Sequence, residues 1–193
     1  MKKKILLIVL CIAGVLTRAQ TQTKSSVLQL QIDALIDKGV TFATYNPYKF
    51  VEKRTYEDKG VYYSYEVNKN VIKQLYERQH EYIKLWLPMP DGSIEEILLK
   101  RNYFLASDFK ATYTNENGVH NEFYKSGIYY NGVLVNKSSM AVFSVFENKI
   151  FGLFSDEKGN WNLGPKSNTA YYALYCEKEL SLPLKFECNA LNR

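Results

Sequence analysis

The chain has 193 residues, of which 46% are hydrophobic and 23% charged, a composition that suits one globular domain and excludes an intrinsically disordered chain. Its net charge of +5 comes mostly from Lys2, Lys3, Lys4 and Arg18, because removing these four from the 25 Lys and Arg leaves 21 basic against 20 acidic side chains. The near-neutral balance that remains excludes the broad basic surface of a nucleic-acid-binding protein.

The first 19 residues have the three parts of an export signal peptide. Three lysines form its basic start, and residues 5–16 form an apolar run too short to span a bilayer. Thr17 and Ala19 are the small residues that a signal peptidase recognises. We therefore expect cleavage between Ala19 and Gln20, and a secreted or cell-surface protein that has no membrane contact afterwards.

The mature chain is expected to hold one domain. Residues 20–26 are polar and predict a loose N-terminus, whereas residues 27–193 carry the apolar patterns of a folded, β-rich unit. The 16 tyrosines and 10 phenylalanines support this, because both side chains favour the half-buried surfaces of sheets.

Residues 27–78 contain one ambiguous segment, one clear strand and one clear helix. Segment 27–38 fits a helix, which would place Leu28, Ile32 and Leu35 on one face, but alternation at its start fits a strand equally well. Residues 61–65 alternate as a strand, and Asn68 can cap a helix over residues 69–78.

From residue 82 onward the chain alternates apolar and polar side chains between turn signals, which predicts consecutive β-hairpins. The expected strands cover residues 82–87, 93–101, a stretch ending near 114, 128–130, 133–135, 140–146, 149–155, 161–163, 170–176 and 184–188. Asn117–Gly118 and Asn131–Gly132 predict tight turns, since an Asn-Gly step favours positive φ. The hairpin of residues 140–155, turning at Glu147–Asn148, is expected at the centre of the sheet.

The fold class that follows is mainly β: an antiparallel sandwich or barrel built of consecutive hairpins, with one or two short helices.

No catalytic or metal-binding constellation is found in the sequence. His80 begins like a zinc-binding helix motif, but Lys84 stands where the second histidine would have to be. Glu95 and Glu96 are neighbours on a predicted strand, so their carboxylates point to opposite faces and cannot share acid–base work. With His120 as the other histidine, we expect no catalytic residue, no metal and no cofactor, and no enzymatic activity in this chain on its own.

Aromatic side chains offer one further candidate site. Tyr129–Tyr130, Trp161 and Tyr171–Tyr172 could form a sugar-stacking platform on a sheet. Adjacent residues of a strand face opposite ways, however, so we expect most of these rings to be core and cross-strand pairs.

Cys176 and Cys188 are the cysteines that follow the signal peptide. Their compartment is oxidising and no third cysteine competes, so a disulfide between them is the simplest expectation. Two free thiols are the alternative.

An ordered set of segments spans most of residues 66–188. The segments are Asn68–Val71, Leu87–Gly92, Ala106–Lys110, Tyr130–Gly132, Ser139–Phe146, Ile150–Asp156, Gly159–Gly164 and Tyr172–Tyr175. In this order they resemble the propeptide region of secreted bacterial metalloproteases with a reprolysin-like (adamalysin-type) zinc domain. Each segment alone is ordinary hairpin chemistry, and their order carries the resemblance.

The resemblance implies a propeptide that assists the folding of a downstream or cognate metalloprotease domain and keeps it inactive until cleavage. The sequence stops at Arg193, where a catalytic domain would be expected to begin. Two interpretations remain open: a precursor fragment, or a stand-alone secreted or cell-surface binding or adhesion module of β-sandwich type.

The resemblance also gives Cys188 a second candidate role. A thiolate is a strong zinc ligand, and a propeptide can hold a zinc protease latent by placing a thiolate on the metal. Cys188 lies near the expected junction with the catalytic domain. We favour the disulfide with Cys176 over this zinc-latency role.

Overall fold

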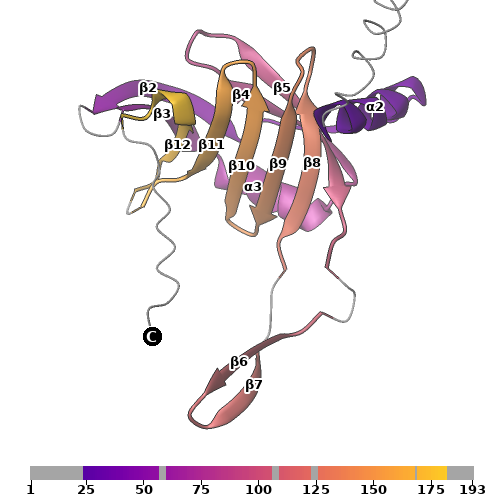
Figure 1. Cartoon of the computed structure of the whole chain (residues 1–193), viewed down its shortest axis with the longest axis vertical. Helices are drawn as coiled ribbons and strands as arrows, with labels where there is room; N and C mark the ends of the chain where they lie inside the picture. Colours follow the sequence, from indigo (N-terminus) through magenta and orange to yellow (C-terminus); the bar gives the residue numbers. More distant parts are fainter. Residues whose placement is uncertain (1–23, 57–59, 106–108, 123–125, 168, 182–193) are drawn as a thin grey trace, which may run out of the picture.

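The computed structural model describes residues 24–56, 60–105, 109–122, 126–167 and 169–181. These residues are mainly β, and they form one curled ten-stranded sheet, a separate two-stranded hairpin and two α-helices (Figure 1). The predicted fold class of consecutive hairpins with few helices is confirmed. The helices are α2 (Lys24–Asp37) and α3 (Lys69–Arg78), and a 3-10 turn, η1, covers Glu177–Glu179.

The large sheet has the strand order β1-β4-β5-β8-β9-β10-β11-β12-β3-β2, and its pairs are antiparallel except for β1 with β4. Its strands are β1 (Ala43–Tyr45), β2 (Tyr48–Tyr56), β3 (Gly60–Val67), β4 (Tyr82–Pro88), β5 (Ile94–Asn102), β8 (Ile128–Leu134), β9 (Met140–Phe146), β10 (Lys149–Asp156), β11 (Gly159–Pro165) and β12 (Tyr172–Cys176). The small sheet pairs β6 (Ala111–Asn115) with β7 (Gly118–Glu122).

The two edges of the large sheet belong to consecutive strands of the chain. Only Asn46 and Pro47 separate β1 from β2, yet these strands lie at opposite ends of the strand order. So short a connection requires the sheet to curl until its edges approach each other, which makes it a half-barrel. Contacts between β2 and β4 close the curl at this seam.

The concave, inner face of the sheet holds the main core. Helix α3 packs there against β9 and β10 through Ile72 and Leu75, and in Figure 1 it lies behind these strands. The side chain of Asn68 accepts hydrogen bonds from the backbone N–H groups of Asn70 and Val71, so the predicted cap of this helix is confirmed.

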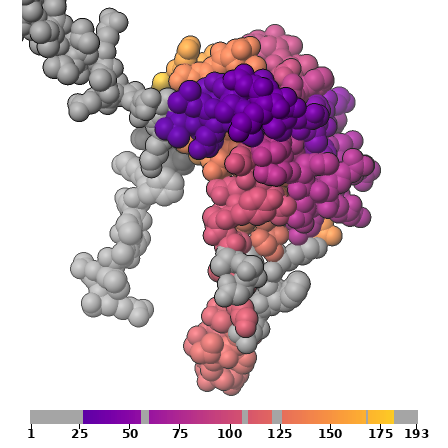
Figure 2. Space-filling model, turned by 90° about the vertical axis from the view of Figure 1, so that its right-hand side faces the viewer, coloured from indigo at the N-terminus to yellow at the C-terminus, as the bar shows by residue number. Residues whose placement is uncertain are grey.

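Helix α2 packs on the opposite, outer face over β5 and β8 (Figure 2). Ile32 is buried against Leu98 and Val133, and Leu28 and Leu35 flank it on the same side of the helix. This spacing of three and four residues is helical, and it resolves the ambiguity of segment 27–38.

The hairpin of β9 and β10 occupies the fifth and sixth places among the ten strands, as predicted. Its turn falls at Glu147–Asn148, as expected. The ring of Phe143 is fully buried on the inner face, whereas Phe151 points outward and is 41% exposed.

The prediction of a turn at Asn131–Gly132 is wrong, because both residues lie in the middle of β8. A Cβ at Gly132 would lie 1.8 Å from the carbonyl oxygen of Leu98 on the neighbouring strand. The glycine therefore permits a close approach of two backbones instead of a turn. The chain turns a few residues later, where Asn136 has a φ of 60°.

The candidate stacking platform divides between the two faces of the sheet. Tyr130, Trp161 and Tyr172 are buried in the core, as the alternation of the strands predicted. Tyr129 is half-buried on the outer face, and Tyr171 is 39% exposed.

Candidate binding surface

The outer face of β9–β12 is not covered by α2, and it contains a shallow groove of about 410 Å³. We call it the outer groove. Its lining comprises Val142, Ser144, Phe151, Gly152, Leu153, Asn162, Leu163, Gly164, Pro165, Ala173 and Tyr175. Small residues on three adjacent strands form the floor, and Phe151 and Leu153 stand above it with 41% and 44% of their surface exposed.

A row of aromatic side chains extends the apolar surface from the groove towards β5. The ring of Phe151 contacts Phe146, which contacts Tyr129, which contacts Phe104, with centroid distances of 6.1, 6.4 and 4.5 Å. Phe104 is 58% exposed. Contiguous apolar surface of this kind marks a place where proteins bind a partner.

Polar groups border the groove at the end near η1. The amide nitrogen of Asn162 donates to Glu177 at 3.3 Å, and Asn160 donates to the same carboxylate at 3.0 Å. Burial, with the neighbouring Tyr62 and Glu177, raises the pKa of Tyr175. The hydroxyl of Ser144 makes no hydrogen bond with the described residues, so the groove can accept polar as well as apolar contacts.

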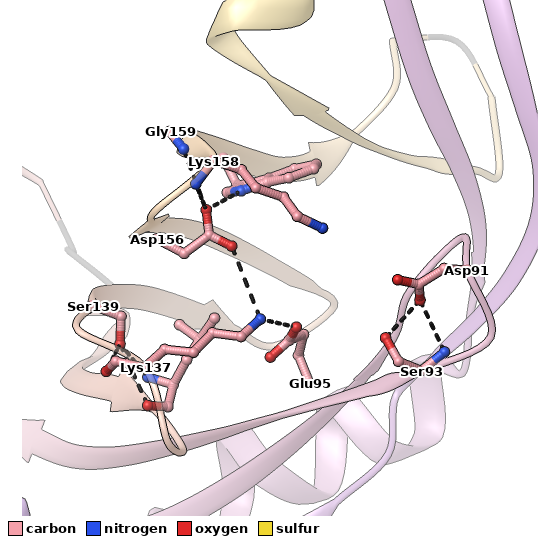
Figure 3. A network of polar contacts seen from close by, with 10 residues as sticks. Asp91, Ser93, Glu95, Lys137, Ser139, Asp156, Lys158 and Gly159 are labelled. Atoms are coloured by element: carbon pink, nitrogen blue, oxygen red, sulfur yellow. Dashed lines mark hydrogen bonds and ion pairs between the residues drawn. The ribbon is translucent and has the colours of Figure 1, made fainter.

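A partly buried ion-pair network fixes the ends of the strands that carry the groove (Figure 3). One carboxylate oxygen of Asp156 accepts hydrogen bonds from the indole of Trp161 and from the backbone N–H groups of Lys158 and Gly159. Its other oxygen lies 4.0 Å from the ammonium of Lys137.

The same lysine also pairs with Glu95 of β5. The network therefore joins β5, the turn between β8 and β9 and the turn between β10 and β11. The side chain of Asp156 is only 6% exposed, which makes it a structural anchor and not a binding group.

The hairpin of β6 and β7 stands away from the sheet at the lower end of the molecule (Figures 1 and 2). It is held by pairing between its own two strands and by stacking of Tyr113 on His120 at 5.2 Å. Tyr113 and Val119 are 48% and 73% exposed. We call this hairpin the arm.

The histidines and acidic residues singled out in the sequence lie apart. His80 precedes β4, and its carbonyl oxygen accepts a hydrogen bond from Tyr130, while His120 lies in the arm next to Asn115. Glu95 and Glu96 face opposite ways, as predicted, and pair with Lys137 and Lys84 respectively.

Cys176 is buried at the end of β12, where its sulfur lies 3.8 Å from the carbonyl oxygen of Lys158, and it has no disulfide partner among the described residues. Cys188, the expected strand 184–188 and the signal cleavage site at Ala19–Gln20 fall outside the described residues. The disulfide, the zinc-latency role of Cys188 and the export signal therefore stay predictions.

Within the described residues, no group of three or more His, Cys, Asp and Glu side chains could hold a metal ion. In the same part of the chain, neither helix has the length and apolar character needed to cross a membrane.

The outer groove and the arm were not found from the sequence. The groove is built mainly by outward-facing residues of four strands, and each strand alone shows ordinary alternation. The arm does carry a signal, because its strands lack an apolar face that a sheet could bury.

Comparison with protein-family models, with curated proteins and with solved structures found no match for this chain.

Proposed function

We propose that this chain is the N-terminal propeptide of a secreted zinc metalloprotease precursor, and that the catalytic domain docks on the outer groove. The observation that carries the proposal is the composition of the groove. Four segments on which the resemblance rests, namely 139–146, 150–156, 159–164 and 172–175, supply every lining residue except Pro165.

The surface has the properties that a folding template needs. It lies on the central strands, which are paired on both sides and backed by the main core, so its shape is held rigidly. Burial of exposed rings such as Phe151 against a partner is favourable by about 25 cal/mol per Å² of apolar surface. A catalytic domain that folds on this surface and stays bound would be both assisted and kept inactive.

The first test is the reading frame beyond codon 193. A His-Glu-x-x-His motif in the same frame supports the propeptide, because two histidines one helical turn apart with a glutamate make a zinc protease site. Absence of such a motif, both there and in neighbouring genes for secreted proteins, counts against it.

The second test measures inhibition of that catalytic domain by purified residues 20–193. Leu153→Glu, in the groove, should abolish inhibition and reduce the refolding yield of the protease domain. Leu30→Glu is the matched control, because Leu30 is 59% exposed on α2 and lies outside the groove. Circular dichroism should show both variants folded. Equal inhibition by the two variants would remove the groove as the docking surface.

A stand-alone surface binding module is the second candidate. The polar border of the groove favours it, since Ser144 and Asn162 beside an exposed ring would suit a polar ligand. Two results together would favour this candidate. One is that no protease partner is found, and the other is that the protein binds cell-surface polymers and loses this binding when Leu153 is changed to Glu.

A further inference from the structure

The sequence contains two Asn-Gly steps, and the structure places them in opposite environments. Asn117–Gly118 lies at the tip of the arm, and Asn131–Gly132 lies in the middle of β8. Because the reacting residues are the same, any difference in their chemistry must come mainly from the fold.

At the tip of the arm the step is open. Asn117 is exposed, and its carboxamide makes no hydrogen bond with the described residues. Gly118 has a φ of +111°, and apart from its two chain neighbours no described residue has an atom within 4 Å of the position that a Cβ would occupy. Gly118 pairs only with Asn115 across the turn, so only this one exposed strand pair holds its backbone nitrogen away from the Asn117 side chain.

The hairpin that holds this turn is also weakly supported. A two-stranded hairpin is at best marginally stable without further packing, so it opens at low free-energy cost. The hydrogen bond from the Asn117 N–H to the side chain of Asn115, 2.8 Å long, is exposed to solvent.

In β8 the second step is closed. Asn131 is paired with Lys100 on one side and Val142 on the other, and Gly132 is paired with Leu99 and Ala141. The tight approach of Gly132 to the Leu98 carbonyl prevents the backbone rotation that would bring its nitrogen to the Asn131 side chain. Reaction here requires local unfolding of a central strand.

From this contrast we infer that Asn117 is a site of spontaneous deamidation in the folded protein. The backbone nitrogen of Gly118 loses its proton to solvent and attacks Cγ of Asn117, and ammonia leaves as the new C–N bond closes a five-membered succinimide. Water then opens the ring at either carbonyl, which yields an aspartyl or isoaspartyl residue at position 117. The reaction needs only water and base.

The product changes the end of the arm. A new carboxylate appears beside Glu116, and the isoaspartyl form adds a methylene to the backbone inside a turn that pairs Asn115 with Gly118. Reaction at Asn117 would thus alter the charge and the register of the arm as the protein ages. This inference does not depend on the propeptide role.

The test is peptide mapping by mass spectrometry of residues 20–193 after incubation in mildly alkaline buffer. In the native protein the rate at position 117 should exceed the rate at position 131 by at least about tenfold, because only the second step must wait for a strand to open. In denaturant the two rates should become similar, since the fold no longer separates them. Asn117→Gln should remove the arm signal, because a glutamine would have to close a larger ring.

Each outcome decides the matter. A native preference for position 117 that disappears in denaturant supports the inference. Equal native rates, a faster native rate at position 131, or conversion at position 117 only after denaturation would overturn it.

Discussion

The central hairpin of β9 and β10 and the arm of β6 and β7 have the same local structure, two strands joined by a short turn, but they lie in opposite surroundings. Both place a short turn between alternating strands, yet the first lies in the middle of a ten-stranded sheet and the second pairs only with itself. The difference lies in the side chains of one face. The central hairpin turns Ala141, Phe143 and Val145 into the core, whereas the residues of β6 are nearly all exposed.

Turn chemistry therefore decides that a hairpin forms, and an apolar face decides whether a sheet incorporates it. The first hairpin therefore contributes to the stability of the large sheet, whereas the second stays exposed to solvent and to reactions or contacts at the surface.

The largest effect should come from truncating the core ring of the central hairpin. Phe143→Ala is expected to lower the free energy of unfolding by about 3–5 kcal/mol, because a fully buried ring is lost and a cavity remains. Phe151→Ala should cost only about 1–2 kcal/mol, since that ring is partly exposed. Urea unfolding followed by tryptophan fluorescence measures both.

Tyr113→Ala in the arm is the control and should change the unfolding free energy by no more than about 0.5 kcal/mol. A cost for Phe151→Ala as large as that for Phe143→Ala would show that the outer face is covered in solution.

Two turns with similar side-chain caps give the next comparison. Asp156 accepts from the N–H of Lys158 two residues on, just as Asn115 accepts from the N–H of Asn117. Asp156→Ala should cost about 2–3 kcal/mol, because it also leaves the buried indole of Trp161 without a partner and removes one of the two carboxylates beside the ammonium of Lys137. Asn115→Ala, exposed in the arm, should cost about 0.5 kcal/mol or less. Equal costs would refute the anchoring role of the Asp156 network.

Alkaline pH should lower the free energy of unfolding, because buried tyrosines of the large sheet would have to ionise. Burial raises the pKa of Tyr65 and of Tyr48 above the ordinary value near 10. A raised pKa means that the folded state keeps the proton more tightly, so the stabilisation is complete below pH 10 and is lost as pH rises above it. Each such group can lower the free energy of unfolding by at most about 1.4 kcal/mol per pH unit there. Urea midpoints measured across this range that stay constant would contradict the burial of these hydroxyls.

Removing single tyrosine hydroxyls should lower stability where the hydroxyl has a hydrogen-bond partner, but not where it has none. Tyr65 donates to the carbonyl of Pro88 at 2.7 Å and Tyr130 to that of His80 at 2.9 Å, so changing either to Phe should cost about 0.5–1.5 kcal/mol. The buried hydroxyl of Tyr48 has no hydrogen-bond partner among the described residues. Tyr48→Phe should therefore leave the stability unchanged or raise it, and a loss as large as that of Tyr65→Phe would reveal a hidden partner.

Local signals predicted local structure well. The Asn68 cap marks the start of helix α3, and the alternation of residues 140–155 specifies both a hairpin and its central place. The same reasoning failed at Asn131–Gly132. There the glycine is needed because its backbone lies against the carbonyl of Leu98, about thirty residues away in sequence, and not because the chain turns.

The outer groove could not be predicted for a related reason. Ser144, Asn162 and Ala173 look like the ordinary outward residues of three separate strands. Only the strand order brings them side by side, and strand order depends on long-range pairing that no local pattern encodes.

Deleting the whole arm should have little effect on stability for the number of residues removed. The pairing of β5 with β8 already closes at Asn102 and Tyr129, so the arm is an insertion beyond a complete ladder. Replacing residues 104–127 by a two-residue turn should change the free energy of unfolding by no more than about 1 kcal/mol. The shorter loop gains about 0.6 kcal/mol per halving of length, and this offsets the lost contact between Phe104 and Tyr129 and the hydrogen bond from Tyr76 to Ser126.

A variant that fails to fold, or that loses several kcal/mol in urea unfolding, would mean that the arm is packed against the large sheet. If the variant is stable and still inhibits a protease domain while Leu153→Glu does not, the sheet face and the arm are separate in function as well as in structure.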